Sequence, residues 1–386
     1  MFYIKPSGLY LETHRLFLPR EECFMIDCME SCKGVIGTMP RKGKKRIHLA
    51  TAAGTAIVAA AAAAGWCKWR NCRYPLEKEY RFINKFFIPG SFLSPRFLKF
   101  ANARLYSMKL PVPPDGIKRY MKWMETRDGE RLRLTVYRPS DAKKTFPCLV
   151  YFHGGGFCLA DAPYLHKTVA EYARQAECAV VLVHYRTSDR YPFPVPFQDC
   201  CDGLEYIRRH EKELHIDGFR IAVGGDSAGG ALAAACALWS RDTGKADICF
   251  QMLIYPVLDC RMETESMRKF TDSPLWNAGL NRKMWQLYLQ KPGLEKVEYA
   301  SPALAENLHK LPDAYIEVEQ FDCLHDEGAA FAERLRSAGA AVQLEDVRGT
   351  FHGFDVFRKK TVTQKMIRMR ILALQRAFQQ DSCIIF

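Results

Sequence analysis

The sequence predicts an α/β fold with a doubly wound, mostly parallel central sheet and helices on both of its faces. Three observations favour this fold. Short β-branched runs alternate along the chain with segments of helical periodicity. One predicted strand leads into a Gly-x-Ser-x-Gly turn, and another leads into three consecutive glycines. Such alternation is typical of strand–helix–strand units whose strands lie parallel in one sheet.

The expected sheet begins with a hairpin over residues 121–138, which alternate around Asp128-Gly129, a dipeptide typical of tight turns. The further strands are expected at 148–152, 179–184, 220–223, 250–255, 315–318 and 342–347. Helices are expected near 163–176, 197–213, 228–242, 326–338 and 361–379.

Charge is distributed unevenly along the 386 residues, whose net charge is +13. Residues 1–120 hold 21 lysines and arginines against 8 acidic residues, whereas the remainder holds 35 of each. The N-terminal excess favours a membrane surface or a targeting segment, and we expect no nucleic-acid partner. The 15 cysteines are odd in number and scattered, which favours reduced thiols in a reducing compartment. No metal site is expected, because their spacings match no standard zinc motif.

The N-terminal region divides into a basic extension at 1–47 and a candidate transmembrane or signal-anchor helix at 48–67. The run 49–67 carries no charge and has basic residues on both sides, as a membrane anchor does. The run is mostly alanine, so a soluble alanine-rich helix and a cytoplasmic protein stay open as alternatives. We expect a membrane-associated protein.

Residues 68–125 are expected to form a linker and short cap helices. Phenylalanines are frequent between residues 82 and 100, where Pro89 and Pro95 interrupt the pattern. This pattern predicts amphipathic helices with a large aromatic face. That face either packs over the functional site as a cap or lies on a membrane interface, and we favour the cap.

Ser227 lies between a predicted strand that ends at Val223 and a predicted helix that begins at Ala228. This is the position of a nucleophile elbow, in which a sharp turn raises the serine hydroxyl above the sheet. Gly225 and Gly229 let the strand and the helix approach each other closely. The sequence therefore predicts that Ser227 is a catalytic nucleophile.

The segment His153-Gly154-Gly155-Gly156 directly follows a predicted strand. Consecutive glycines allow the backbone to turn and to direct N–H groups at a developing oxyanion. A phosphate-binding loop would need a Lys-Ser/Thr pair that is absent from this segment. We predict an oxyanion hole made by the N–H groups of Gly154, Gly155 and Ala228.

His352 is the predicted general base, because it follows the strand 342–347 and has Gly349 and Gly353 on either side of it. Asp322 closely follows the strand 315–318 and is the predicted acid of the triad. Asp326 is the alternative acid, although it is also well placed to cap the next helix. The chain order serine, acid, histidine is that of α/β-hydrolases.

These motifs resemble those of the hormone-sensitive-lipase-like group of α/β-hydrolases, which resembles arylacetamide deacetylase. The resemblance rests on residues 153–157, 185–186, 191–194, 225–230, 322–327 and 352–354. It implies an α/β-hydrolase domain over 126–386, with a helical cap that includes an insertion at about 259–311. The chain departs from the group at Thr187-Ser188-Asp189-Arg190, and Cys323 and His325 stand where proline and arginine are frequent.

The resemblance also implies hydrolysis of carboxylic esters through an acyl-serine, with no metal and no organic cofactor. Short to medium acyl esters or aryl esters are the expected substrates. An amidase or a carbohydrate O-deacetylase would use the same triad, and a ligand-binding relative without catalysis is a further alternative. The chain's intact serine, aspartate and histidine favour an enzyme.

Overall fold

The computed structural model describes residues 61–141, 143–290 and 296–380. An eight-stranded sheet, in the order β1-β2-β4-β3-β5-β6-β7-β8, forms its centre. The first two strands and the β2–β4 pair are antiparallel, and the remaining neighbours are parallel. The strands are β1 (Ile117–Glu125), β2 (Arg131–Pro139), β3 (Phe146–Phe152), β4 (Ala179–Val183), β5 (Ile216–Asp226), β6 (Phe250–Ile254), β7 (Asp313–Glu319) and β8 (Val342–Val347).

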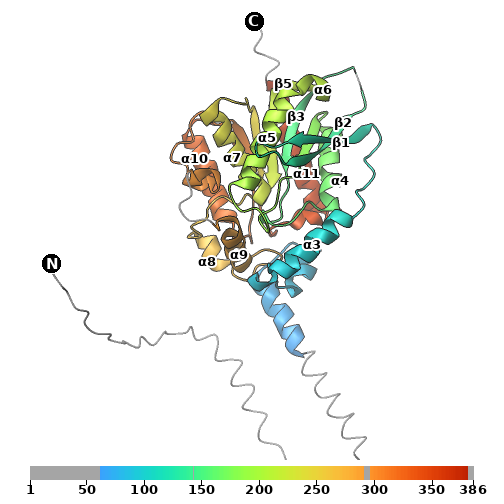
Figure 1. Cartoon of the computed structure of the whole chain (residues 1–386). Coiled ribbons are helices and arrows are strands. Elements are labelled where there is room, and N and C mark those ends of the chain that lie inside the picture. The colour runs from blue at the N-terminus through green and yellow to red at the C-terminus, as the bar shows by residue number, and fades with distance from the viewer. Residues whose placement is uncertain (1–60, 142, 291–295, 381–386) are drawn as a thin grey trace, which may run out of the picture. The chain divides into compact units, whose positions relative to one another are not determined.

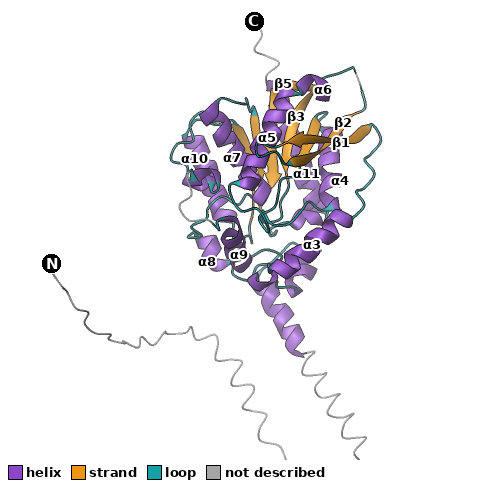
Figure 2. Cartoon of the chain, viewed as in Figure 1, coloured by secondary structure: helices purple, strands orange, loops and turns teal. Residues whose placement is uncertain are grey.

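Helices cover both faces of this sheet, as the ribbon coloured by secondary structure shows (Figure 2). On one face α4 and α11 pack together, and on the other α5 packs against α7. The helices around the sheet are α4 (Pro163–Gln175), α5 (Val195–Arg209), α6 (Glu211–Leu214), α7 (Ala228–Thr243), α10 (His325–Ser337) and α11 (Thr361–Gln380). Because both faces are covered, β3, β4 and β6 are buried along their whole length and consist largely of apolar residues.

The observed elements confirm the predicted fold, and the largest differences among the strand starts are at β1 and β5, which each begin four residues before the predicted position. The hairpin strand β1 pairs with β2 from Ile117 onward, so the sheet begins before residue 126, where we had placed the start of the hydrolase domain. Strand β5 begins at Ile216 instead of residue 220, because its first residues pair with Phe146 across an irregularity in the ladder. Both differences arise from long-range pairing, which the local pattern does not encode.

The cap elements lie together at one end of the fold (Figure 1). They are α3 (Pro95–Ser107), α8 (Glu265–Lys269) and α9 (Ala278–Tyr288), with η2 (Gly90–Phe92) packed against α9. The short 3₁₀ helix η1 (Lys78–Lys85) precedes η2, whereas η3 (Val297–Tyr299) and η4 (Pro302–Leu304) contact α7, and η5 (Phe354–Val356) follows β8. The segment 68–107 contacts the insertion at about 259–311, since Asn277 Nδ2 donates to the Ile88 carbonyl oxygen at 2.9 Å. Arg70 is buried and pairs with Asp272 at 2.7 Å. The segment therefore packs as part of the cap.

The first described residues, 61–73, form a helix. Most of the expected anchor at 48–67 and all of the basic extension at 1–47 lie outside the described residues. Within residues 61–380, as far as they are described, no helix is both long and apolar enough to cross a membrane.

Candidate active site

Ser227 sits in a sharp turn between β5 and α7. Its φ of 56° lies in the left-handed region, a strained conformation for a non-glycine residue and the usual one at a nucleophile elbow. The turn requires glycine on both sides of the serine. A Cβ on Gly225 would overlap the backbone of Gly229, and one on Gly229 would overlap the Phe152 carbonyl. The Ser227 N–H donates to the Ile254 carbonyl oxygen at 2.8 Å, which holds the elbow against β6.

The structure brings Ser227, His352 and Asp322 together from three separate loops. The His352 ring lies with Nε2 at 2.9 Å from Ser227 Oγ and with Nδ1 at 2.6 Å from Asp322 Oδ2. All three residues are buried. When Nδ1–H donates to the carboxylate, Nε2 remains free to accept the serine proton, which is the arrangement a general base needs.

Asp322 is held in place by its own loop, because the Leu324 N–H donates to Asp322 Oδ1 at 3.0 Å. The alternative acid, Asp326, does not contact His352. Its carboxylate accepts the Ser266 N–H at 2.7 Å and bonds the ring of His325 at 2.8 Å. The geometry thus favours the first of the two aspartates suggested by the sequence.

The glycine loop differs in one respect from the prediction. The Gly154 N–H donates to Asp226 Oδ1 at 3.1 Å, so it is not available to an oxyanion. Among the described residues, the N–H groups of Gly155 and Gly156 have no acceptor. Ala228 is the first residue of α7, where N–H groups lack intrahelical acceptors. Gly156 therefore replaces Gly154 in the candidate oxyanion hole, beside Gly155 and Ala228.

A buried histidine supports this loop from behind. The His153 ring stacks on Tyr185 with centroids 4.2 Å apart, and the Tyr185 hydroxyl donates to the His153 carbonyl oxygen at 2.8 Å. Burial lowers the pKa of His153 to about 4. The ring is thus neutral near pH 7, and its role is to fix the backbone that precedes Gly154 and the glycines after it.

Two aromatic rings lie against His352 of the triad. The Tyr255 ring meets His352 edge to face at 4.8 Å, and Trp276 lies 5.8 Å from the same ring. A Cβ on Gly156 would lie 2.9 Å from Trp276 and 3.3 Å from Met284. These two residues of the insertion at about 259–311 therefore form a wall of the site.

Other aromatic residues of the insertion have a packing role. Tyr288 stacks on Phe157 with centroids 3.8 Å apart, and Trp285 lies 5.9 Å from the same ring. Both insertion residues are buried. The aromatic insertion is thus divided between the wall of the site and ordinary core.

Asp226 has an unusual environment for a carboxylate. Burial raises its pKa to about 6, the charge of Asp355 adds to this effect, and hydrogen bonds from Tyr151 and Gly154 oppose it. At pH values between the pKa of Asp226 in the unfolded chain and its pKa of about 6 in the folded protein, the folded protein binds more protons than the unfolded one. Stability contributed by this group is therefore present at lower pH and is lost as the pH rises through about 6.

We expect Asp226→Asn to stabilise the protein near pH 7 by on the order of 3 kcal/mol, because the amide carries no buried charge. The gain should shrink towards about pH 4, where the wild-type carboxyl is protonated in the folded state. Urea unfolding of both proteins at the two pH values measures the difference. An equal difference at both would show that the buried charge is not its source.

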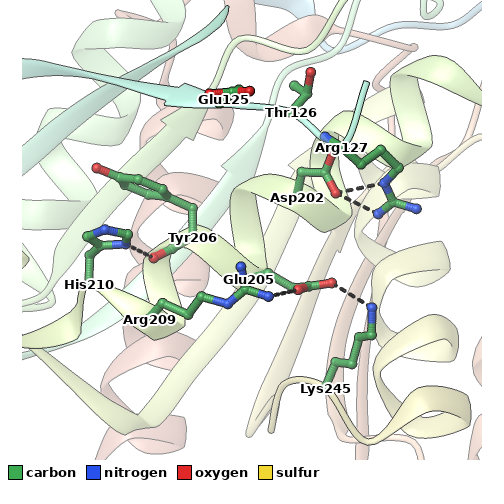
Figure 3. Close-up of a pocket in the computed structure, with 9 residues that line it drawn as sticks. All are labelled: Glu125, Thr126, Arg127, Asp202, Glu205, Tyr206, Arg209, His210 and Lys245. Atoms are coloured by element: carbon green, nitrogen blue, oxygen red, sulfur yellow. Dashed lines mark hydrogen bonds and ion pairs between the residues drawn. The ribbon is translucent and has the colours of Figure 1, made fainter. Parts of the chain in front are cut away.

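A separate hollow of about 490 Å³ lies beside the hairpin and α5, and none of the triad residues lines it (Figure 3). Its charged side chains, apart from Glu125, pair with one another. Arg127 pairs with Asp202 at 2.6 Å, and Glu205 pairs with both Arg209 and Lys245 (Figure 3). Every lysine and arginine that lines the hollow thus has an acidic partner, and Glu125 alone of its charged residues forms no ion pair within the described part of the chain. Over the residues that the structure describes, no three acidic, histidine or cysteine side chains are grouped to hold a metal ion.

The sheet order, the elbow and the serine–histidine–aspartate contacts define an α/β-hydrolase. Residues 149–356 match the model of the family described as having the α/β hydrolase fold, and the chain belongs to this family.

The chain's relatives include several esterases. It is 34% identical over 209 residues to esterase LipI of Mycobacterium tuberculosis, a match that covers 54% of this chain and 65% of that protein. It is 31% identical over 273 residues to carboxylesterase NlhH of the same organism, covering 69% and 85%. A solved bacterial heroin esterase superposes with a TM-score of 0.73 at 33% identity, over 79% of this chain and 99% of that one.

Proposed function

We propose that the protein is a serine hydrolase that cleaves carboxylic esters, with short to medium acyl esters or aryl esters as its substrates. The observation that carries the proposal is the contact of His352 with both Ser227 and Asp322. The relatives that share the fold and about a third of the sequence are named esterase and carboxylesterase, which supports the same reaction class. Trp276 and Met284 crowd the glycine loop, which favours acyl groups of limited length.

In the proposed mechanism, His352 Nε2 takes the Ser227 proton while Oγ bonds to the ester carbonyl carbon. The N–H groups of Gly155, Gly156 and Ala228 stabilise the negative oxygen that forms. The carbon–oxygen bond to the alcohol then breaks, and His352 donates its proton to the departing alcohol. In the second half, His352 takes a proton from water, which attacks the acyl-serine carbonyl carbon. The bond to Ser227 Oγ then breaks, His352 returns the proton to Oγ, and the carboxylic acid is released. The resemblance implies no cofactor, and none of these steps needs one.

Two measurements on the full chain test this function. The first is the hydrolysis of p-nitrophenyl esters from acetate to palmitate, with the highest kcat/KM expected at short or medium chain length. The second is labelling by a fluorophosphonate, with the adduct located on Ser227 by peptide mass spectrometry. A folded protein that neither turns over any ester nor accepts the label would contradict the proposal. Labelling of Ser227 without turnover of any p-nitrophenyl ester would instead favour an amidase or a carbohydrate O-deacetylase that uses the same triad.

We further propose that the protein is membrane-associated through residues 48–67. The uncharged run at 49–67 and the basic residues on both sides of it support this location. Alkaline carbonate extraction of the native protein tests the proposal. An anchored chain stays in the membrane pellet, whereas release into the supernatant would favour the soluble alternative.

A further inference from the structure

Exposed large apolar side chains are concentrated in one stretch of the chain. Of the fifteen such side chains in the described part, ten lie between residues 66 and 112. They are Trp66, Trp69, Phe82, Phe86, Phe87, Phe92, Phe100, Tyr106, Met108 and Val112. Single exposed apolar residues are ordinary, but a cluster of this size on a soluble surface marks a binding surface. We call residues 66–112 the aromatic segment.

The aromatic segment forms the outer side of the cap. Figure 1 shows η1, η2 and α3 at the same end of the fold as α8 and α9. Helix α3 buries Leu98 and Asn102, while Lys99 and Phe100 are exposed, with 70% of Phe100 accessible. Over 64–73, every residue except Cys67 and Arg70 is exposed. The described fold thus leaves these surfaces without a protein partner.

The same segment is strongly basic. Between residues 66 and 112 there are ten lysines and arginines and only two acidic residues, Glu77 and Glu79. Lys85 and Lys99 are exposed and form no ion pair among the described residues. Aromatic rings interleaved with unpaired cations suit the headgroup region of an anionic bilayer, where rings enter the interface and cations meet lipid phosphates.

The place of the segment in the chain favours a membrane over a second protein copy. It begins at the end of the uncharged run 49–67, where Trp66 lies within the run and Trp69 lies two residues beyond it. Tryptophans at this position are typical of a membrane–water interface. Two copies would also bring two net-positive faces together, which like-charge repulsion opposes.

We propose that the aromatic segment docks on the surface of an anionic phospholipid bilayer. This docking places the cap, and the candidate active site beneath it, against the lipid. Two contacts link the docked surface to the site. Asn102 on α3 bonds the Cys158 carbonyl oxygen at 3.0 Å and the Ala160 N–H at 2.9 Å, immediately after the glycine loop. If the proposed esterase function holds, esters dissolved in the bilayer are its substrates.

Hydrogen–deuterium exchange of the full chain with vesicles tests the docking without reference to activity. We expect slower exchange of residues 82–109 on phosphatidylcholine vesicles that contain phosphatidylserine, and less protection at high salt. The β1–β2 hairpin should exchange unchanged. Unprotected residues 82–109 on vesicle-bound protein would overturn the proposal, and so would a failure to bind vesicles. Protection that needs no lipid and grows with protein concentration would point to a second copy and overturn it as well.

Matched variants assign the effect to the segment. Phe100→Ala and Lys99→Glu should each lower the fraction of protein docked in this exchange assay, by roughly tenfold in the docking equilibrium. Phe219→Ala and Lys365→Glu are the controls, because Phe219 is 77% exposed and Lys365 is exposed outside the aromatic segment. Equal effects from both pairs would contradict the assignment. The vesicle readout persists in Ser227→Ala, so failure of the docking and failure of the esterase function are distinguishable.

Discussion

Replacing Ser227 by alanine is expected to lower kcat for ester hydrolysis by roughly five to six orders of magnitude, because no other group can form the acyl intermediate. The fold should survive the change, since the serine hydroxyl contacts only the His352 ring. Ser188→Ala is the matched control, because Ser188 is also buried and its hydroxyl has no hydrogen-bond partner among the described residues. Turnover of p-nitrophenyl butyrate by the three proteins measures the effect. Activity in Ser227→Ala within a factor of ten of wild type would exclude the proposed mechanism.

The acid of the triad can be tested in the same assay. Asp322→Asn should lower kcat by about four orders of magnitude, because an amide no longer holds the imidazole in the tautomer that accepts the serine proton. Asp326→Asn should leave kcat nearly unchanged, since Asp326 bonds Ser266 and His325 instead of His352. The reverse order of effects would reinstate Asp326 as the acid.

Most of the sheet could be predicted from the sequence because its strands carry strong local signals. Strands β3, β4 and β6 are short apolar runs bounded by turn residues, and this local pattern predicts buried strands. The elbow was equally predictable, because a glycine–serine–glycine turn at a strand–helix junction has few other uses. The order of the motifs also suggested that Ser227, Asp322 and His352 would converge, and their geometry agrees.

Other features depend on contacts that no local pattern encodes. Three adjacent glycines give equivalent backbone donors, and only the position of the Asp226 carboxylate shows that Gly154 is already bonded. The phenylalanine pattern between residues 82 and 100 predicted short amphipathic helices, and α3 is such an α-helix, whereas η1 and η2 are short 3₁₀ helices. Pro89 explains the break between them, because proline disfavours a helical residue before it. The first strand also needed its long-range partner to be recognised.

A buried charge network was not predicted either, because its members lie far apart in the sequence. Arg370 on α11 bonds Glu317 of β7 through two nitrogens, one of them at 2.9 Å, and bonds Asp355 at 2.7 Å. The Tyr255 hydroxyl donates to Asp355 at 2.6 Å, and the Tyr255 ring rests against His352. The C-terminal helix is thereby connected to the general base. Asp355, three residues after the histidine, thus has a structural role in this network.

Arg370→Met is expected to destabilise the protein by about 3–5 kcal/mol, because it leaves Glu317 and Asp355 buried without their cation. Arg370 is completely buried, so water cannot replace the guanidinium at its place. Chemical denaturation near pH 7 measures the loss. Arg376→Met on the same helix is the control, since Arg376 is exposed and contacts only Gln343 and its own helix backbone. The control should cost less than about 1 kcal/mol.

The double variant Arg370→Met, Glu317→Gln separates lost packing from uncompensated charge. If the buried carboxylate is the main cost, the second change should recover a large part of the stability, because removing both charges of a buried pair is often nearly neutral. A double variant as unstable as Arg370→Met alone would place the cost in packing instead.

The same network also predicts an effect on catalysis, because Asp355 bonds Tyr255, whose ring lies against His352. If the network positions the histidine, Asp355→Asn should alter the pH profile of kcat in protein that remains folded, whereas Arg376→Met should not.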